Sequence, residues 1–463
     1  MNKVELRAAS SLAAVFSARL LGLFMIYPVF AAYAGHLRDS TPLLIGLSLG
    51  AYGLTQGLLQ LPFGLLSDRI GRKQVIVGGL ILFAIGSAVA AASTSITGVL
   101  LGRVLQGTGA IGSTVLALVA DLTSEESRTK AMALVGMTIG LSFAFAIVAG
   151  PALAGVIGVA GIFWLTAILA FVGIAITLFL VPRPVRKMRH RDAEAVPALI
   201  GRVLRDRELL RLDFAIFALH AVLTASFLAV PQVLSGALGL TSHEDWRVYL
   251  PVLAASVVLM VPVIILAEKR RRMKEVFLVT ILLLGVSQLA LWLASAGTQI
   301  GTGVTGASIV IAALIAFFTA FNIMEASLPS LITKTAPPDA KGTATGIFSS
   351  AQFLGIFVGG ALGGGAYGMD GLRGVFLFTL GVTLLWLIAA LGMRRPGHYS
   401  SYLARLGTVD RGMAAELAAR LDAVPGVIEA VVVAEEGIAY LKIDRARFDA
   451  AAVGRITGQL QEA

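Results

Sequence analysis

The sequence predicts an all-α membrane protein with twelve transmembrane helices in two six-helix repeats, followed by a small α+β domain. Three observations lead to this prediction. Of the 463 residues, 57% are hydrophobic and 14% are charged, whereas roughly a quarter of the residues of an average soluble domain are charged. Twelve apolar stretches are long enough to cross a bilayer, which requires about 20 residues each. After residue 397, acidic and basic residues become frequent, as in a soluble domain.

The apolar stretches fall into two groups of six, separated by a polar connection. The first six are predicted at Ser10–Gly35, Pro42–Leu66, Gln74–Ala92, Thr97–Ala120, Ala131–Ile157 and Gly161–Val181. The second six are predicted at Leu212–Leu234, Trp246–Ala267, Val276–Ala294, Gly303–Leu328, Gly342–Tyr367 and Val375–Met393. We therefore predict an N-terminal bundle over residues 1–181, a cytoplasmic linker over 182–211, a C-terminal bundle over 212–393 and a tail domain over 398–463.

Lysine and arginine predict the orientation of the spans. The loops and ends on one side carry 25 of these residues and those on the other side carry 3. Cytoplasmic loops hold the excess of basic residues, so both termini are predicted to be cytoplasmic. The formal net charge of +10 is explained by this asymmetry, and it therefore gives no reason to expect nucleic-acid binding. The expected surroundings are a lipid bilayer.

The two halves of the chain resemble each other. Leu61-Pro62-Phe63, with charged residues shortly after it, recurs 200 residues later as Val261-Pro262-Val263, again followed by charges. Internal repeats of this kind are typical of secondary transporters, whose substrate path lies between the repeats. The repeat therefore predicts a small-molecule transporter.

The tail domain is predicted to have the order β-α-β-β-α. Its expected strands are Ser400–Leu406, Ile428–Ala434 and Ile438–Ile443, and its expected helices are Asp410–Leu421 and Ala446–Leu460. This is the order of a ferredoxin-like domain without its last edge strand. The chain has no cysteine, so we do not expect the tail to carry copper or zinc on a Cys-x-x-Cys loop. We hypothesise that it binds a small ligand or self-associates.

A charged motif, GLLSDRIGRK, follows the second span. It contains Gly64, Asp68, Arg69, Gly71, Arg72 and Lys73. The motif resembles the signature between the second and third spans of the major facilitator superfamily. The resemblance implies that Asp68 pairs with charges at the end of the fourth span, where Asp121 stands, and that Arg72 bridges the two. Such a network acts as a latch that forms in one conformation and breaks in the other. The alternative is a set of solvated loop charges.

Two further motifs resemble the same superfamily. Arg103 and Gln106 in LGRVLQGTGA match its fourth-span motif, whose arginine is associated with proton transfer. The glycines that follow also satisfy G-x-G-x-x-G, but no strand precedes them, so a dinucleotide site is not expected.

Gly140, Gly150, Pro151 and Gly155 resemble the antiporter signature of the fifth span, although alanine stands at 146 and 154 where glycine is usual. Together with the cysteine-free tail, these motifs resemble the YajR-type transporters of bacterial inner membranes, which implies a multi-pass inner-membrane location.

Ionisable residues inside spans are costly and therefore indicate function. Glu325 is the only carboxylate predicted well inside a span, and His220 lies about a third of the way along the seventh. We interpret both as candidate proton carriers, with Arg19 or Arg103 as countercharges. A packing role remains the alternative for His220, and a structural ion pair for Glu325.

Polar and aromatic residues in several spans are predicted to line the substrate cavity. Tyr52, Gln56 and Gln60 recur at intervals of four on one face of the second span, and a polar face should meet a water-filled path rather than lipid. The other candidates are Phe24, Tyr27, Gln106, Asn322 and Gln352. Interhelical hydrogen bonding is the alternative for Tyr52, Gln56 and Gln60. The glycines at 46, 50, 53 and 57 and from 359 to 365 instead indicate close helix packing.

The function predicted from these features is a proton-coupled efflux antiporter of small amphipathic compounds that works by alternating access. It would need no cofactor and no metal, since the proton gradient supplies the energy. An uptake symporter or uniporter of the same fold is the first alternative, and a membrane sensor with the tail as its output is the second. The sequence has no Walker loop, HExxH or GxSxG motif, so an enzyme is not expected.

Overall fold

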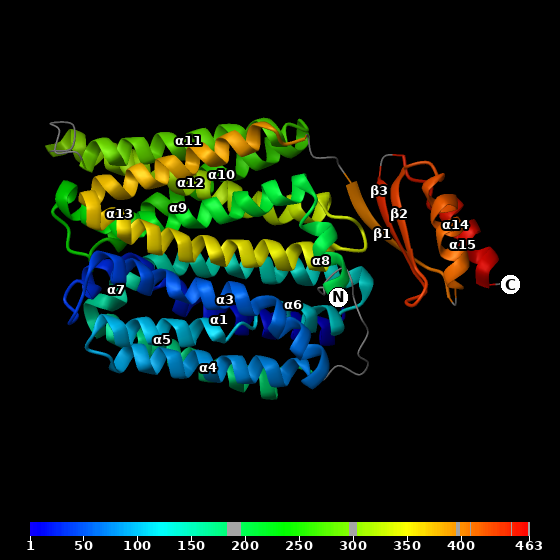
Figure 1. The fold of residues 1–463 in the computed structure, drawn as a ribbon, viewed down its shortest axis with the longest axis horizontal. Coiled ribbons are helices and arrows are strands. Elements are labelled where there is room, and N and C mark those ends of the chain that lie inside the picture. The colour runs from blue at the N-terminus through cyan, green and yellow to red at the C-terminus, as the bar shows by residue number, and fades with distance from the viewer. Residues whose placement is uncertain (183–195, 296–302, 395–398, 408, 446, 462–463) are drawn as a thin grey trace.

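The protein consists of a bundle of long helices and a separate small domain at one end of it (Figure 1). The computed structural model describes residues 1–182, 196–295, 303–394, 399–407, 409–445 and 447–461. The N-terminus lies at the end of the bundle that faces the small domain (Figure 1). We call this end the tail end. Residues 183–195 of the predicted linker and residue 398 of the predicted tail lie outside the described residues.

The N-terminal half contains seven helices that make six crossings. They are α1 (Lys3–Phe24), α2 (Tyr27–Ala34), α3 (Pro42–Ile70), α4 (Arg72–Ala92), α5 (Ile96–Thr108), α6 (Gly112–Asp121) and α7 (Glu125–Phe179). The pairs α1 with α2 and α5 with α6 are each one crossing with an interruption. Gly71 has φ +108°, a conformation open to glycine, and it makes the tight turn from α3 to α4.

The C-terminal half follows the short linker helix α8 (Pro197–Val203). Its helices are α9 (Arg207–Leu238), α10 (Trp246–Lys269), α11 (Met273–Ser295), α12 (Gly303–Thr335) and α13 (Lys341–Leu391). Ten described helices are long and apolar enough to cross a membrane. Helices α7 and α13 have 55 and 51 residues and non-helical backbone at Gly158 and at Asp370–Gly371. A bilayer core of about 30 Å is crossed by about 20 residues, so each supplies two crossings, and the predicted twelve are obtained.

The halves meet along a seam between α3 and α13 where glycines bring the two backbones into contact. A Cβ atom on Gly46 would lie 2.1 Å from the carbonyl oxygen of Gly360, and one on Gly53 would lie 2.4 Å from that of Phe353. Since real Cβ atoms do not approach so closely, only glycine fits there. The close packing predicted for these glycines is confirmed except at Gly365, where nothing lies within 4 Å of an added Cβ.

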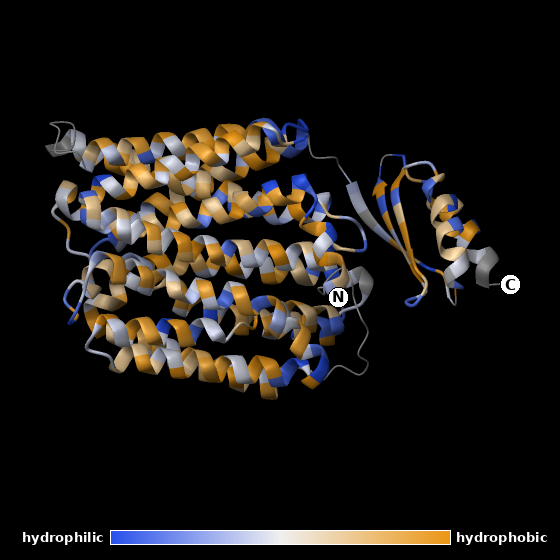
Figure 2. Cartoon of the chain, viewed as in Figure 1, coloured by the Kyte–Doolittle hydropathy of each residue, from blue (hydrophilic) through white to orange (hydrophobic). Residues whose placement is uncertain are grey.

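The outer surface of the bundle is apolar, and hydrophilic residues gather at its two ends (Figure 2). Large side chains such as Phe179 and Val156 are 79% and 82% exposed. Apolar area of this extent is unstable in water but is expected where lipid covers the protein.

The tail domain has a three-stranded antiparallel sheet in the order β1-β3-β2, as the ferredoxin-like prediction requires. Its elements are β1 (Tyr399–Arg405), α14 (Arg411–Asp422), β2 (Val427–Val433), β3 (Ile438–Asp444) and α15 (Ala450–Gln461). The sheet lies between the bundle and the two helices (Figure 1). Contacts of described residues join it to α8 and the bundle: Arg202 Nη2 lies 3.5 Å from Glu429 Oε1, and Lys442 Nζ donates to the carbonyl of Thr335 over 3.0 Å.

Candidate functional site

The two predicted proton carriers lie beside each other in the C-terminal half. His220 of α9 is 1% exposed, and its Nε2 lies 3.7 Å from Oε2 of Glu325 on α12. The side-chain nitrogen of Gln352 on α13 lies 2.8 Å from the same Nε2, and Nδ1 of His220 lies 3.2 Å from the carbonyl oxygen of Ile216. The carbonyl only accepts and the amide nitrogen only donates. Nδ1 of His220 therefore carries its proton, and Nε2 is the free base that faces Glu325.

Aromatic rings from both halves surround this pair. Phe321 lies 5.8 Å from the His220 ring and 5.1 Å from Phe143 of α7, centroid to centroid. Phe143 in turn lies 5.1 Å from Phe24. Tyr27 packs 5.7 Å from Phe227 of α9. The predicted cavity residues Phe24 and Tyr27 thus lie at the boundary between the halves, where their rings close the space in this conformation.

Arg19 and Arg103 do not act as countercharges to Glu325 here, so that interpretation is corrected. Both lie in the N-terminal half around Tyr52, whose ring centroid is 5.5 Å from Cζ of Arg19 and 5.2 Å from Cζ of Arg103. No ion pair joins either arginine to a carboxylate in the part of the chain that the structure describes. The reason is that the arginines belong to the N-terminal half and Glu325 to the C-terminal half.

A chain of hydrogen bonds runs along the polar face of α3. Arg19 donates to Oε1 of Gln56, and Nε2 of Gln56 donates to Oε1 of Gln60 over 2.7 Å. Gln56 and Gln60 are 0% and 4% exposed. These side chains therefore form an internal polar row, and Gln60 is its member nearest the tail end.

Two predicted cavity residues lie elsewhere, and that interpretation is corrected for both. Gln106 is fully buried between helices, where it accepts from Arg103 and donates to Ser87 of α4 over 2.7 Å. Asn322 donates to Ser256 of α10 over 2.9 Å, within the C-terminal half. Both amides satisfy helix-to-helix hydrogen bonds, which the sequence analysis did not foresee for these two residues.

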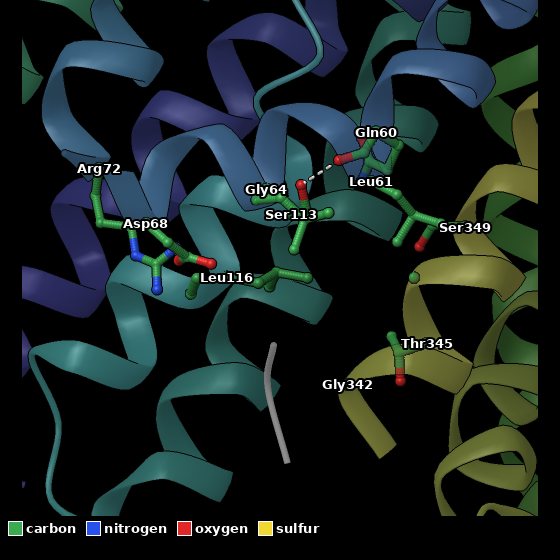
Figure 3. A pocket seen from close by; sticks show the side chains of 13 residues that line it. Gln60, Leu61, Gly64, Asp68, Arg72, Ser113, Leu116, Gly342, Thr345 and Ser349 are labelled. Carbon is green, nitrogen blue, oxygen red and sulfur yellow. Dashed lines mark hydrogen bonds and ion pairs between the residues drawn. The ribbon is translucent and has the colours of Figure 1, made fainter. Parts of the chain in front are cut away.

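A small cavity of about 40 Å³ lies between the halves at the tail end. Gln60, Gly64 and Asp68 line one wall, and Thr345 and Ser349 of α13 line the opposite wall (Figure 3). The hydroxyl of Ser113 donates to the carbonyl of Gln60 over 2.7 Å. Gln60 is the only member of the predicted cavity set in this wall. Neither Ser113 nor the α13 hydroxyls were candidates, because no local pattern marks an isolated Ser or Thr in a span.

The predicted latch residues meet beside this cavity. The guanidinium of Arg72 binds Asp68, and its Nε lies 3.1 Å from Oδ2 of Asp121 at the end of α6. Side-chain exposure is 8% for Arg72 and 2% for Asp121. The network is therefore largely desolvated and is not a set of solvated loop charges.

Three other members of the motif have different surroundings. Gly64 packs against Ser113, whose Oγ would lie 3.0 Å from an added Cβ. Lys73 Nζ donates to the carbonyl of Val181 over 2.5 Å. Arg69 is exposed and makes no ion pair among the described residues, so its inclusion in the latch is corrected.

The glycines of the fifth-span motif do not share one role. A Cβ atom on Gly150, just before Pro151, would lie 2.3 Å from the carbonyl oxygen of Met25, so this position requires glycine. Gly155 faces His243 of the other half. Gly140 is exposed, with nothing within 4 Å of an added Cβ. The packing role predicted for Gly140 is therefore wrong, because this part of α7 faces away from the bundle.

Three buried acids were not among the candidates. Asp213 lies two turns before His220 on α9, is 6% exposed, and neither of its oxygens has a hydrogen-bond partner. Asp245 precedes α10 and is also unpartnered. Glu5 accepts from the backbone of Ser124 over 2.9 Å and joins α1 to α7. The Asn2–Glu5 capping box was readable from the sequence, whereas the burial of the other two acids depends on packing.

No group of three His, Asp or Glu side chains suited to a metal occurs in the described part of the chain.

Known proteins are similar to this chain over most of its length. Residues 12–359 and 212–417 match the Major Facilitator Superfamily, and residues 412–453 match the YajR YAM domain. The inner membrane transport protein YajR of Escherichia coli is 44% identical over 446 residues, which cover 96% of this chain and 95% of YajR. The multidrug resistance protein MdtH of Aeromonas salmonicida is 28% identical and covers 81% of this chain and 93% of its own.

Solved structures agree on the fold. A bacterial homologue of the human lysosomal transporter Spinster, in an inward-facing and occupied conformation, has a TM-score of 0.66 at 15% identity and covers 84% of this chain and 97% of its own. The human organic anion transporter MFSD10 has a TM-score of 0.55 at 19% identity, covering 84% of this chain and all of its own. The twelve crossings, the two related halves and these similarities lead to one conclusion: the chain is a multi-pass membrane transporter that belongs to the major facilitator superfamily and carries a YAM domain at its C-terminal end.

Proposed function

We propose that this transporter is a proton-coupled antiporter that exports small organic compounds across a bacterial inner membrane. The observation that carries the proposal is the pairing of Glu325 with His220 inside the bundle, 3.7 Å apart and among aromatic rings. His220 already has hydrogen-bond partners in Gln352 and Ile216, so its position does not depend on the charge of Glu325. Ionisable groups in such surroundings are expected to serve transport.

The proposed orientation places the tail end in the cytoplasm. The tail end carries Lys73, Arg202 and Lys442 in the structure, and 25 basic residues belong to this side against 3 on the other. The positive-inside rule then puts both termini and the YAM domain in the cytoplasm. The inner-membrane location is supported by the similarity to YajR of Escherichia coli.

The proposed mechanism is alternating access between two cavities. One cavity lies at the tail end, and a second, of about 300 Å³, lies at the opposite end between Pro42 and Ile45 of α3 and Tyr367 of α13. A proton on Glu325 removes the charge of the carboxylate from these aromatic surroundings. Proton binding drives the change of state only to the extent that the affinity of Glu325 for the proton differs between the states.

The Arg72 network is proposed as the latch of one of these states. It fixes the start of α4 to the ends of α3 and α6, immediately beside the tail-end cavity. A desolvated ion network is stable only in the geometry that pairs it, so it favours one position of α3. Release of the network would let the tail end of α3 move relative to α13.

Reconstituted vesicles with an imposed pH gradient test the function. The transported probes are carboxyfluorescein, N-phenyl-1-naphthylamine and ethidium, which are anionic, neutral and cationic, with pyranine inside to report protons. We expect movement of at least one probe to be coupled to proton movement in the opposite direction. Glu325→Gln should abolish the coupling, whereas Glu268→Gln, at an exposed carboxylate, should not. Full coupling in Glu325→Gln would refute the assignment.

The same vesicles separate the alternatives. Movement of probe and proton in the same direction would identify a symporter, and movement that ignores the pH gradient would identify a uniporter. Removal of residues 398–463 tests the sensor alternative. A transporter should keep its basal flux without the tail, and a protein whose output is the tail should show no flux in either form.

A further inference from the structure

Two guanidinium groups are buried around one tyrosine ring in the N-terminal half. Arg19 is 1% exposed and Arg103 is fully buried, and both lie over Tyr52, which is itself fully buried. Neither forms an ion pair with a carboxylate among the described residues. Buried charges in proteins are normally paired, so two uncompensated positive charges at the same place require an explanation.

The hydrogen bonds of this cluster are incomplete. Arg103 is well held, since it donates to the carbonyls of Ser48 and Leu49 over 3.2 and 3.3 Å and to Oε1 of Gln106 over 2.9 Å. Arg19 donates to Gln56, but its Nε has no acceptor, and the hydroxyls of Tyr52 and Ser48 have no partner either. Ser48 and Tyr52 are one turn apart on α3. Three buried polar atoms without partners are thus gathered beside two positive charges.

A path leads from the cluster to the tail-end cavity. The amide row continues from Arg19 through Gln56 to Gln60, and Gln60 stands in the cavity wall (Figure 3). Each member of the row is polar and buried, so a polar group that enters the cavity meets hydrogen-bonding side chains as far as Arg19.

The cluster also lies directly at the boundary between the halves. The Tyr52 ring is 6.1 Å from that of Phe353 on α13, and Phe83 lies 6.4 Å from Tyr52 on its other side. Beside it, α3 and α13 are in backbone contact at Gly53. Separation of the halves at this seam would expose Tyr52 and, with it, both guanidinium groups.

We propose that the Arg19–Tyr52–Arg103 cluster binds the anionic head group of the transported compound, so that the cargo is an aromatic organic anion. A carboxylate or sulfonate would accept from Nε of Arg19 and from the Tyr52 hydroxyl and would compensate the two positive charges. Phe83, Phe353 and the Tyr52 ring would contact the apolar part. The proposal deepens the proposed transport function and rests on it.

Binding to the full-length protein in lipid nanodiscs tests the proposal. The probes share one ring system: 2-naphthalenesulfonate, 2-naphthalenemethanol and (2-naphthylmethyl)trimethylammonium, which are anionic, neutral and cationic. We expect the sulfonate to bind about tenfold more tightly than either of the others by calorimetry. Absence of sulfonate binding, or equal affinity for the alcohol or the ammonium compound, would overturn the proposal. This comparison needs no variant, so it decides even if substitutions prevent folding.

Variants locate the site. Arg19→Gln should weaken sulfonate binding about tenfold and leave the alcohol unaffected. Arg7→Gln removes the same charge from an exposed position of the same helix and should leave sulfonate binding unchanged. If Arg19→Gln binds the sulfonate normally, the cluster is only a packing feature. Glu325→Gln should retain sulfonate binding even where proton coupling is lost, so failure of the proposed transport function and failure of this site give different results.

Discussion

His243 lies against Gly155, although the two residues belong to different halves of the transporter. A Cβ atom on Gly155 would be 3.2 Å from the Cβ of His243. Gly155 is near the end of the first part of α7, just before the break at Gly158, and His243 is in the loop between α9 and α10. The halves therefore touch at the end opposite the tail domain, on the side of the bundle away from the α3–α13 seam.

We predict that Gly155→Leu weakens closure of this end, because a larger side chain displaces the loop that carries His243. The chain has no native cysteine, so Ala31→Cys, in the cavity at this end, reports access by its rate of alkylation. The rate should rise several-fold in Gly155→Leu. Gly140→Leu is the matched control, since an added side chain there meets nothing within 4 Å. Equal alkylation rates in the two variants would show that the contact has no role in closure.

Loss of the Arg72 cation should destabilise the tail end. Removing one partner from a buried ion pair costs about 3–5 kcal/mol, and Asp121 is almost fully buried. Arg72→Gln is therefore expected to lower the thermal unfolding midpoint by several degrees, at the low end of that range because Asp68 is partly exposed. Arg69→Gln removes an equal charge from an exposed position and should change the midpoint little. If both variants have the same unfolding midpoint, the ion pairs of Arg72 do not stabilise the tail end beyond the effect of an exposed charge.

Asp245 should make stability depend on pH. Burial, with the neighbouring charge of Glu244, raises the pKa of this carboxyl from 3.8 to about 8. Between these values the folded protein holds a proton that the unfolded chain releases, so stability falls as pH rises from about 4 to 8 and is constant above that. Asp245→Asn should be more stable than the parent at pH 8 and should lose this part of the pH dependence.

Thermal unfolding from pH 5 to 8.5 measures this effect. Asp370→Asn changes an exposed aspartate in another loop and serves as the control, with the same slope as the parent. A parental slope retained in Asp245→Asn would assign the dependence to other groups.

The tail domain is expected to be held by a small number of polar contacts. Arg202 lies between Asp339 of the bundle, at 3.1 Å, and Glu429 of β2. Burial raises the pKa of Glu429, and Lys442 and Arg202 oppose that shift. Exposed ion pairs contribute about 0–1 kcal/mol each, so Arg202→Ala combined with Lys442→Met should increase hydrogen exchange of β3 without unfolding the domain. Arg455→Ala, at a side chain that is 70% exposed, should have no such effect.

The sequence predicts the spans well because the thickness of the bilayer imposes their length and polarity. It also predicts the seam, since glycines at intervals of three and four permit only close packing. It does not show which polar side chains share a helix-to-helix contact. Gln106 was therefore placed in the cavity although it bonds to Ser87. The partner of Glu325 depends on the packing of α9 against α12. This packing brings His220 beside Glu325 and leaves Arg19 in the other half.

The glycine seam between α3 and α13 determines which contacts oppose movement of one half of the transporter relative to the other. Backbone faces backbone at Gly46 and Gly360, so no side chains have to disengage at this point of the seam before the halves tilt. Elsewhere in the middle of the molecule the ring contacts of Phe143 with Phe321 and of Tyr27 with Phe227 have to separate. The energy barrier of the transport cycle must then come from these aromatic contacts and from the end of the bundle where the His243 loop touches the other half.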